Sequence, residues 1–245
     1  MKYKDIKEKF NKFLDHIFVP DIKCIVCGKE IKRNERYCMC DKCLLSLPTI
    51  IHPCTKCGGE CVSGDVCLNC KTITPSFTNC YVVLKYSPPV TALIHKAKYK
   101  NAKYLFKYLS NLMYDKYLEL GLDIDMLIPV PLNENRIKER GYNQSLLLCE
   151  TFIKYGVHID NDVLIRTKDT PHQTSLTREQ RLTNLDKAFK VVDKSKIKGK
   201  TILILDDVYT TGSTLNEISK TLIKAGASKV YGLVLAHGDI YLPME

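Results

Sequence analysis

Several features that define common classes of protein are missing from this sequence. No run of about 18 apolar residues occurs, so the sequence predicts no membrane-spanning helix. The first twenty residues carry five lysines and three acids where a secretory signal needs an apolar stretch. Repeats at solenoid periods and low-complexity tracts are also absent. We therefore expect a soluble, cytoplasmic protein without a repeat architecture.

Two glycine-rich nucleotide-binding motifs are absent as well. The sequence contains neither G-x-x-x-x-G-K-[ST] nor G-x-G-x-x-G. The tripeptide Gly199-Lys200-Thr201 resembles the end of the first motif, but it precedes an apolar strand instead of following one. These absences disfavour an ATPase and a dinucleotide-dependent dehydrogenase.

The composition that remains is that of a globular protein. The chain has 245 residues, of which 45% are hydrophobic and 26% charged, enough for one sizeable core and a small accessory module. The formal net charge is +10, from 37 basic and 27 acidic residues. Such an excess favours anionic partners, for example phosphates or nucleic acid.

The pattern of apolar residues divides the chain into three parts. Residues 1–20 predict an amphipathic helix, which packs on its own protein or docks on a partner or membrane surface. Residues 21–75 are rich in cysteine and lack long apolar periodicity, so they predict a module that depends on a metal. Residues 76–245, beyond a boundary near Pro75, alternate apolar strands with helical segments. This alternation predicts an α/β domain with a mostly parallel sheet and helices on both faces.

Ten of the twelve cysteines lie between Cys24 and Cys70. Two sets of paired C-x-x-C knuckles account for eight of them: Cys24, Cys27, Cys40 and Cys43, then Cys54, Cys57, Cys67 and Cys70. Four thiolates satisfy a tetrahedral Zn²⁺, so the spacing predicts one or two structural zinc sites, arranged as two sequential ribbons and not as a cross-braced pair. A reduced or partly oxidised cysteine cluster is the alternative.

Three further cysteines have simpler interpretations. Cys38 and Cys61 lie within the cysteine-rich module, where either could substitute as a ligand. Cys149 follows three leucines in a helical run and is interpreted as an inert core thiol. No cysteine has the signature of a nucleophile.

The most informative segment is 201–214. An apolar strand, 201–205, ends in the acids Asp206 and Asp207, and a loop with small hydroxyl side chains then leads into a helix. The loop residues are Thr210, Thr211, Gly212, Ser213 and Thr214. Hydroxyls and amides at a helix start bind phosphate, whereas paired carboxylates suit sugar hydroxyls or Mg²⁺. The segment therefore predicts a site for a ribose 5-phosphate ligand. A capped helix alone would explain the threonines but not the acids.

A second apolar strand, 126–130, ends at a proline-bounded loop that carries three cations. Arg136, Lys138 and Arg140 have the charge that a leaving pyrophosphate requires. The alternative is that these cations belong to a solvated helix start.

At segment 201–214 the chain resembles the type I phosphoribosyltransferases, and with its cysteine module it resembles the ComF family of competence-associated, phosphoribosyltransferase-like proteins. The resemblance runs from about residue 18 to 237. Matching segments are 93–100 (LIHKAKYK), 129–131 (PVP), 140–144 (RGYNQ) and 170–173 (TPHQ), together with Arg178, Arg181 and Asn184.

This resemblance implies a type I phosphoribosyltransferase-like fold and a ligand, Mg²⁺-bound phosphoribosyl pyrophosphate. It implies that Asp206 and Asp207 contact the ribose diol, that Thr210–Thr214 hold the 5-phosphate, and that the loop after Pro131 binds pyrophosphate. Segment 170–184 is then a candidate mobile cover. The resemblance further implies a link to DNA uptake in natural competence, for which single-stranded DNA or DNA-handling proteins are candidate partners. It names no acceptor.

The stretch 85–107 contains six lysines and no acid, interleaved with tyrosines. Lysines for phosphates and aromatic faces for bases are typical of a groove for single-stranded DNA. In the alternative, helical spacing turns Tyr104 and Leu105 into the core and leaves the lysines solvated, with His95 as a local hydrogen-bonding partner. Two hypotheses follow: a phosphoribosyl transferase, or a binding module that senses the same ligand and engages DNA.

Overall fold

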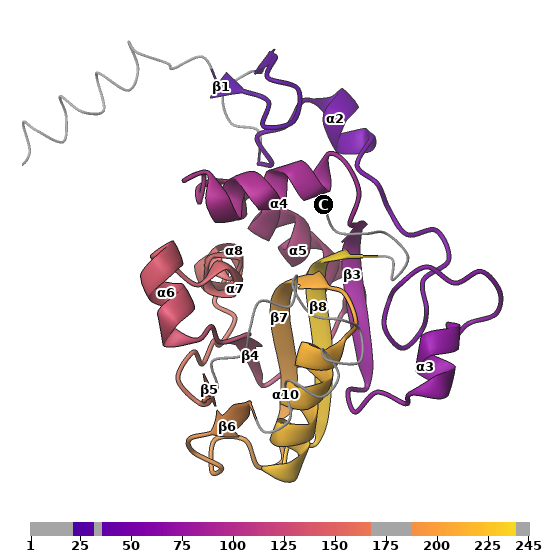
Figure 1. Cartoon of the computed structure of the whole chain (residues 1–245), viewed down its shortest axis with the longest axis vertical. Coiled ribbons are helices and arrows are strands. Elements are labelled where there is room, and N and C mark those ends of the chain that lie inside the picture. Colours follow the sequence, from indigo (N-terminus) through magenta and orange to yellow (C-terminus); the bar gives the residue numbers. More distant parts are fainter. Residues whose placement is uncertain (1–21, 32–35, 168–187, 239–245) are drawn as a thin grey trace, which may run out of the picture. The chain divides into compact units, whose positions relative to one another are not determined.

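The computed structural model describes residues 22–31, 36–167 and 188–238 (Figure 1). The helix expected over 1–20 and the cover expected over 170–184 lie outside these ranges. The chain forms two compact units, Met1–Ser46 and Leu47–Glu245. Among the described residues, no helix is both long and apolar enough to cross a membrane.

The described part of the smaller unit is built around short elements and cysteines. Strands β1 (Ile22–Lys23) and β2 (Glu30–Ile31) pair in an antiparallel manner, and helix α2 spans Asp41–Leu45. Cys24, Cys38 and Cys43 supply much of its buried surface. So small an apolar interior needs a further source of stability, as expected for a metal-dependent module.

The larger unit is centred on a four-stranded sheet with the order β3-β8-β7-β4 (Figure 1). Its strands are β3 (Asn79–Lys85), β4 (Met126–Pro129), β7 (Thr201–Tyr209) and β8 (Lys229–His237). All three pairings are parallel, which confirms the predicted parallel sheet. A separate antiparallel pair is formed by β5 (Leu164–Arg166) and β6 (Phe189–Val191).

Helices cover the sheet on both faces. The described helices of the larger unit are α3 (Leu68–Thr72), α4 (Val90–Tyr99), α5 (Leu105–Leu120), α6 (Glu134–Arg140), α7 (Gln144–Leu147), α8 (Glu150–Lys154) and α10 (Ser213–Lys224). Helix α10 packs Leu215, Ile218 and Leu222 into a cluster with alternate sheet residues such as Ile202 and Ile204. Helix α5 contacts β8 and β3 and buries its own apolar stripe. Successive strand residues thus face opposite helical layers, as in a doubly covered parallel sheet.

The boundary between the units differs from the one expected near Pro75. It falls between Ser46 and Leu47, so the predicted module 21–75 is divided. The cause is packing: Cys54, Cys57 and Cys70 are buried in the same apolar cluster as the sheet and α10. The second cysteine set therefore belongs to the core of the larger unit, although its sequence resembles the first.

Strand β4 ends before its neighbour β7 at one end of the sheet. Strand β4 ends where Pro129 pairs with Leu205, whereas β7 continues along β8 as far as Tyr209. The last residues of β7 thus have no strand neighbour on the β4 side among the described residues. In parallel sheets this carboxyl end, beside a strand that stops short, is where ligands bind.

Candidate functional site

The predicted acid pair lies at this open end of β7. Asp207 is buried, at 4% exposure, and Asp206 is half-buried. The Ser145 hydroxyl donates a hydrogen bond of 2.8 Å to Asp206 Oδ1, and the Asp207 amide donates one of 2.9 Å to the same oxygen. Burial, together with the charge of Asp207, raises the pKa of Asp206 to about 7. Near neutral pH, Asp206 is therefore divided between its protonated and its charged form.

Lys98 neutralises part of this charge. Its ammonium forms an ion pair with Asp207 Oδ2, and the two side chains are only 17% and 6% exposed. Burial disfavours the charged lysine, but the Asp207 carboxylate outweighs burial and raises the pKa of Lys98. The opposite Asp207 oxygen accepts a hydrogen bond of 3.4 Å from Gln144 Nε2. Both Asp207 oxygens therefore have partners within the protein.

This position of Lys98 corrects the prediction that the whole stretch 85–107 faces DNA. Lys98 points into the site, whereas Lys96 and Lys100 on the same segment are exposed. The alternative interpretation is half right: Leu105 is buried, but Tyr104 is 59% exposed. His95 lies against the ring of Tyr99, with ring centroids 5.0 Å apart.

The predicted phosphate loop connects β7 to α10. Gly212 adopts a φ of 75° immediately before the helix. The hydroxyls of Thr211 and Ser213 lie 2.7 Å apart, and the Ser213 amide donates to Thr211 Oγ1 at 3.4 Å. A side chain at position 212 would overlap the Tyr209 hydroxyl group, so glycine is required there for space as well as for conformation. The loop brings hydroxyls and the start of a 12-residue helix together, an arrangement that suits phosphate.

The predicted cations divide between the site and the surface. Arg136 and Arg140 line a cavity of about 320 Å³, and Lys98, Tyr99 and Tyr142 line it too. Glu139 and Asn101 complete the lining, and Lys138 is exposed outside it. The cavity is large enough for a small ligand, and three of its seven lining residues are cations.

Hydrogen bonds connect this cavity to the acids. Arg140 Nη1 donates to Gln144 Oε1 at 2.6 Å, and Gln144 in turn donates to Asp207. The Tyr142 hydroxyl donates to the Ala97 carbonyl, which fixes the end of α4 beside α6. Cations and carboxylates thus form one connected polar network.

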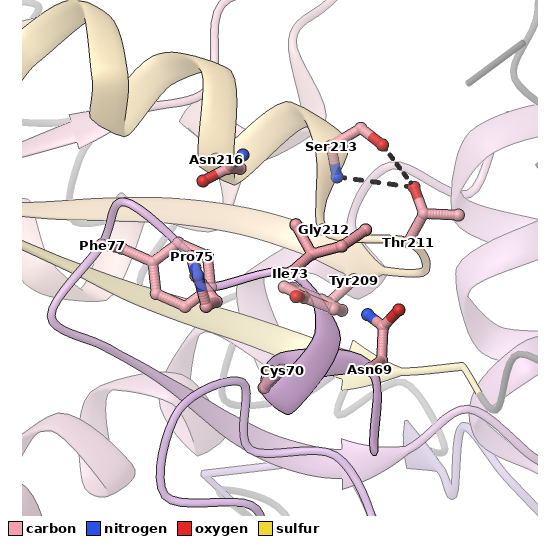
Figure 2. A pocket seen from close by; sticks show the side chains of 10 residues that line it. All are labelled: Asn69, Cys70, Ile73, Pro75, Phe77, Tyr209, Thr211, Gly212, Ser213 and Asn216. Atoms are coloured by element: carbon pink, nitrogen blue, oxygen red, sulfur yellow. Dashed lines mark hydrogen bonds between the residues drawn. The ribbon is translucent and has the colours of Figure 1, made fainter. Parts of the chain in front are cut away.

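Figure 2 shows Cys70, one member of the second cysteine set, near the phosphate loop. Asn69, Cys70 and Ile73 line one side of a small cavity, of about 30 Å³, and Thr211, Gly212 and Ser213 line the other. It has room for water but not for a sugar phosphate. The Ser76 amide donates a hydrogen bond of 2.7 Å to Asn216 Oδ1 of α10, which joins the chain after the knuckle to the helix.

A second set of contacts runs from the first knuckle of this set to the same loop. A Cβ at Gly59 would come within 2.5 Å of the His237 ring, so the knuckle packs directly on His237. The His237 ring stacks on Tyr209 with centroids 4.7 Å apart, and Phe77 meets Tyr209 edge-on at 6.4 Å. Tyr209 in turn lies on Gly212. The second cysteine set therefore supports the phosphate loop from two directions.

Both predicted cysteine sets have the geometry of a zinc site. In each set, the sulfur atoms of the four predicted ligands lie within 4.8 Å of one another. The Sγ atoms of Cys27 and Cys40 are 3.9 Å apart, and those of Cys57 and Cys67 are 3.7 Å apart. Sulfurs bonded to one tetrahedral Zn²⁺ are about 3.8 Å apart, given a zinc–sulfur bond of about 2.3 Å. Each group combines two C-x-x-C knuckles that are consecutive in the sequence, as predicted. A cross-braced arrangement would instead combine the first knuckle with the third.

The charges within each set also fit a cation. Burial opposes ionisation of Cys24, but backbone amides outweigh it and lower the pKa of Cys24 to about 6. Cys54 behaves in the same way, with a pKa lowered to about 6. Burial and neighbouring thiols raise the pKa of Cys43 to about 12, and the Cys70 thiol and burial raise that of Cys57. One thiolate per set thus forms readily, whereas Cys43 and Cys57 need a nearby positive ion to ionise at neutral pH.

The additional cysteines lie outside both four-sulfur groups of the described residues. Cys38 donates a weak hydrogen bond to the Lys23 carbonyl at 3.5 Å. Cys61 is buried, and burial together with the charge of Cys54 raises its pKa to about 11. Cys149 is fully buried, and burial raises its pKa to about 12, in agreement with an inert core thiol.

Three residues of the site were not singled out from the sequence: Lys98 as a partner of the acids, Gln144 and Ser145. Gln144 lies in the RGYNQ segment, and Ser145 follows it directly. Their polar character beside the apolar run 146–148 was the one available signal. The partners that they contact, on β7, lie too far along the chain for sequence spacing to identify.

Comparison with known proteins identifies the larger unit. Residues 159–240 match the phosphoribosyl transferase domain family. The chain is 33% identical to competence protein F of Haemophilus influenzae, across 88% of this chain and 98% of that protein. It is 32% identical to the DNA utilization protein YhgH of Escherichia coli, across 78% of this chain and 87% of that protein.

A third relative matches over a shorter region. Competence protein ComFC of Bacillus subtilis is 33% identical over 101 residues, which cover 41% of this chain and 39% of that protein. The parallel sheet, the acid pair with its hydroxyl loop and the two four-cysteine groups accompany an identity above 30% over nearly a whole relative. This chain belongs to the ComF family and contains a phosphoribosyltransferase domain of type I.

Proposed function

We propose that this protein binds Mg²⁺-phosphoribosyl pyrophosphate and transfers the phosphoribosyl group to an acceptor. The observation that carries the proposal is the joint position of three groups at one end of the sheet. These are the acid pair of β7, the hydroxyl loop before α10 and the cationic cavity beside α6. A ribose with a 5-phosphate and a 1-pyrophosphate needs all three.

Each part of the ligand has a matching partner in the proposal. Asp206 and Asp207 accept hydrogen bonds from the ribose diol, and Thr210–Thr214 hold the 5-phosphate. Arg136 and Arg140 face the pyrophosphate. Lys138, predicted for the same role, is exposed and outside the cavity, which weakens its case. The Mg²⁺ that accompanies the ligand offsets pyrophosphate charge.

The transfer itself proceeds by substitution at C1 of the ribose. The bond from C1 to the pyrophosphate oxygen breaks, pyrophosphate leaves with the electron pair, and the acceptor nucleophile bonds to C1. A positive, oxocarbenium-like charge develops on the ribose, and the carboxylates of the acid pair stabilise this charge. Cations around the leaving group stabilise the negative charge that it gains.

The test is pyrophosphate release from Mg²⁺-phosphoribosyl pyrophosphate in a pooled metabolite extract. Release by the wild type that disappears in the Asp206→Asn, Asp207→Asn double variant supports the transferase. Ligand binding without release in any fraction of the pool refutes transfer and retains a binding module. Melting curves of the double variant check that it is folded.

A second candidate function is binding of single-stranded DNA, linked to DNA uptake in competence. The names of the relatives refer to competence and DNA utilization. The specific observation in its favour is that lysines and tyrosines around the α4–α5 turn are exposed: Lys96, Lys100, Lys103, Lys107, Tyr99 and Tyr104. This composition suits a sequence-tolerant groove.

Mobility shifts with short single strands at two salt concentrations test this candidate. Reversal of the charge at Lys96, Lys100 and Lys103 is expected to weaken binding and to flatten its salt dependence. Unchanged affinity would refute the groove. Lys98 is left out of the variant because it faces the acid pair.

A further inference from the structure

Asp207 is buried and ion-paired inside the protein, and this burial conflicts with the role proposed for it. One of its oxygens pairs with Lys98 and the other accepts from Gln144 at 3.4 Å. A carboxylate that binds a ribose diol must accept two new hydrogen bonds. The two oxygens could accept these bonds beside the existing ones, but Oδ2, the partner of Lys98, is buried from solvent, so the diol can reach both oxygens only if Lys98 moves.

Lys98 is the partner that can move. It lies in the last turn of α4, and its four-carbon side chain ends in a single ammonium without the fixed geometry of an arginine. The backbone beneath it is held firmly, because Ala97 is fully buried and its carbonyl accepts from Tyr142. Gln144, in contrast, is fixed between Arg140 and Asp207 by a hydrogen bond at each end of its amide.

A second place for the ammonium is already built. Lys98 lines the cavity of about 320 Å³ together with Arg136 and Arg140. Glu139 is the one acid in this lining, so the cavity carries a positive excess before any ligand enters. A polyphosphate in this cavity would attract Lys98 away from the acid pair, whereas the empty cavity repels it toward Asp207.

We propose that Lys98 exchanges partners during ligand binding: it neutralises Asp207 in the empty site and binds the pyrophosphate group in the loaded site. This inference rests on the proposed function. It gives Lys98 opposite effects on the two halves of the ligand. Lys98 competes with the ribose diol for Asp207, and it contributes directly to the binding of pyrophosphate.

Calorimetric titration of the full chain at pH 8, with Mg²⁺ present, separates these two effects. The probes are ribose 5-phosphate, which lacks the pyrophosphate, and inorganic pyrophosphate, which lacks the sugar. We expect Lys98→Met to weaken pyrophosphate binding about tenfold or more, as for a lost charge-assisted hydrogen bond. The same variant is expected to bind ribose 5-phosphate several times more tightly. The control, Lys116→Met, removes a lysine whose partner is a surface acid, Glu119, and changes neither affinity.

The opposite signs make the inference refutable. If Lys98→Met weakens the binding of both probes, or changes the affinity for neither, Lys98 does not exchange partners. Should Lys98→Met fail to fold because Asp207 is left buried without its cation, the Lys98→Met, Asp207→Asn double variant removes both charges. We expect this variant to fold and still bind pyrophosphate weakly, and recovery of wild-type pyrophosphate affinity would overturn the inference. A folded wild type that binds neither probe instead refutes the proposed function.

Discussion

Removal of the second metal site is expected to damage the larger unit and its phosphate loop, whereas removal of the first is not. The perturbation is Cys67→Ser, which replaces one of the four thiols in the set that packs beside the loop. Serine is a poor zinc ligand, so the variant should lose this ion. The matched change is Cys27→Ser, which does the same to the set in the smaller unit.

The size of the effect follows from what the second set covers. Phe77 and Tyr209 are 3% and 6% exposed, and both belong to the apolar cluster that includes Cys54, Cys57 and Cys70. Exposing an aromatic side chain costs about 1.5–3 kcal/mol, so release of the knuckle costs about 3–6 kcal/mol. For a domain of this size each kcal/mol lowers the melting temperature by about 2–4 °C. Cys67→Ser should therefore melt at least about 6 °C below the wild type.

Scanning calorimetry of the full chain, combined with zinc analysis, measures this difference. We expect each variant to retain one zinc fewer than the wild type. The main transition, which belongs to the larger unit, should fall with Cys67→Ser and stay within about 1 °C with Cys27→Ser. Binding of ribose 5-phosphate should weaken in Cys67→Ser alone, because Tyr209 lies on Gly212 of the phosphate loop. Equal losses in the two variants, or an unchanged main transition in Cys67→Ser, would refute the reasoning.

Three further predictions concern single positions. Gly212→Ala should abolish ribose 5-phosphate binding in titrations, because its Cβ overlaps Tyr209, whereas Gly156→Ala, at a similar φ with open space around it, should cost only about 1 kcal/mol in denaturant unfolding. Since burial and a neighbouring acid raise the pKa of Asp206 to about 7, the folded chain keeps a proton that the unfolded chain releases near pH 4. The free energy of unfolding should thus fall as pH rises from about 4 to about 7, and Asp206→Asn, measured by urea titration, should flatten this slope. Ser110→Ala removes two buried hydrogen bonds, of 2.7 and 3.0 Å, that join α5 to the α7–α8 segment. It should lower the free energy of unfolding by about 2 kcal/mol in urea titration. An unchanged unfolding midpoint would show that these bonds do not stabilise the fold.

Much of the sheet could be predicted from local patterns, because a strand buried on both faces needs a continuous apolar run. Residues 202–205 of β7 are such a run, and the acids that follow it mark the strand's open end. The same logic located β4 and β8. The antiparallel pair β5–β6 was not predicted, since each of its strands has three residues, too few for a periodic signal.

The direction of Lys98 shows why part of the site could not be predicted. Its stretch contains six lysines, and composition alone describes them as one basic face. The helical period does place Lys98 four residues after the buried Ile94, next to the apolar stripe. An inward lysine nevertheless needs a carboxylate partner, and Asp207 is brought to it only by the pairing of strands far apart in the sequence. The site could therefore be predicted where its residues are neighbours in the sequence, as in 206–214. It could not be predicted where strand pairing brings distant residues together.

One glycine in each cysteine set shows again that sequence does not reveal contacts with distant parts of the chain. Gly28 and Gly58 follow the first knuckle of each set and have the same φ of 73°. Around Gly28, a Cβ would meet nothing within 4 Å, so there the glycine serves the turn alone. A Cβ at Gly58 would come within 2.5 Å of Val82 and 2.8 Å of the Cys80 carbonyl, so there it also allows the knuckle to pack on β3. The same pair of C-x-x-C knuckles thus predicts the same metal chemistry in both sets, but the neighbours decide which knuckle becomes part of the core. That core includes Tyr209, which lies against Gly212 of the phosphate loop.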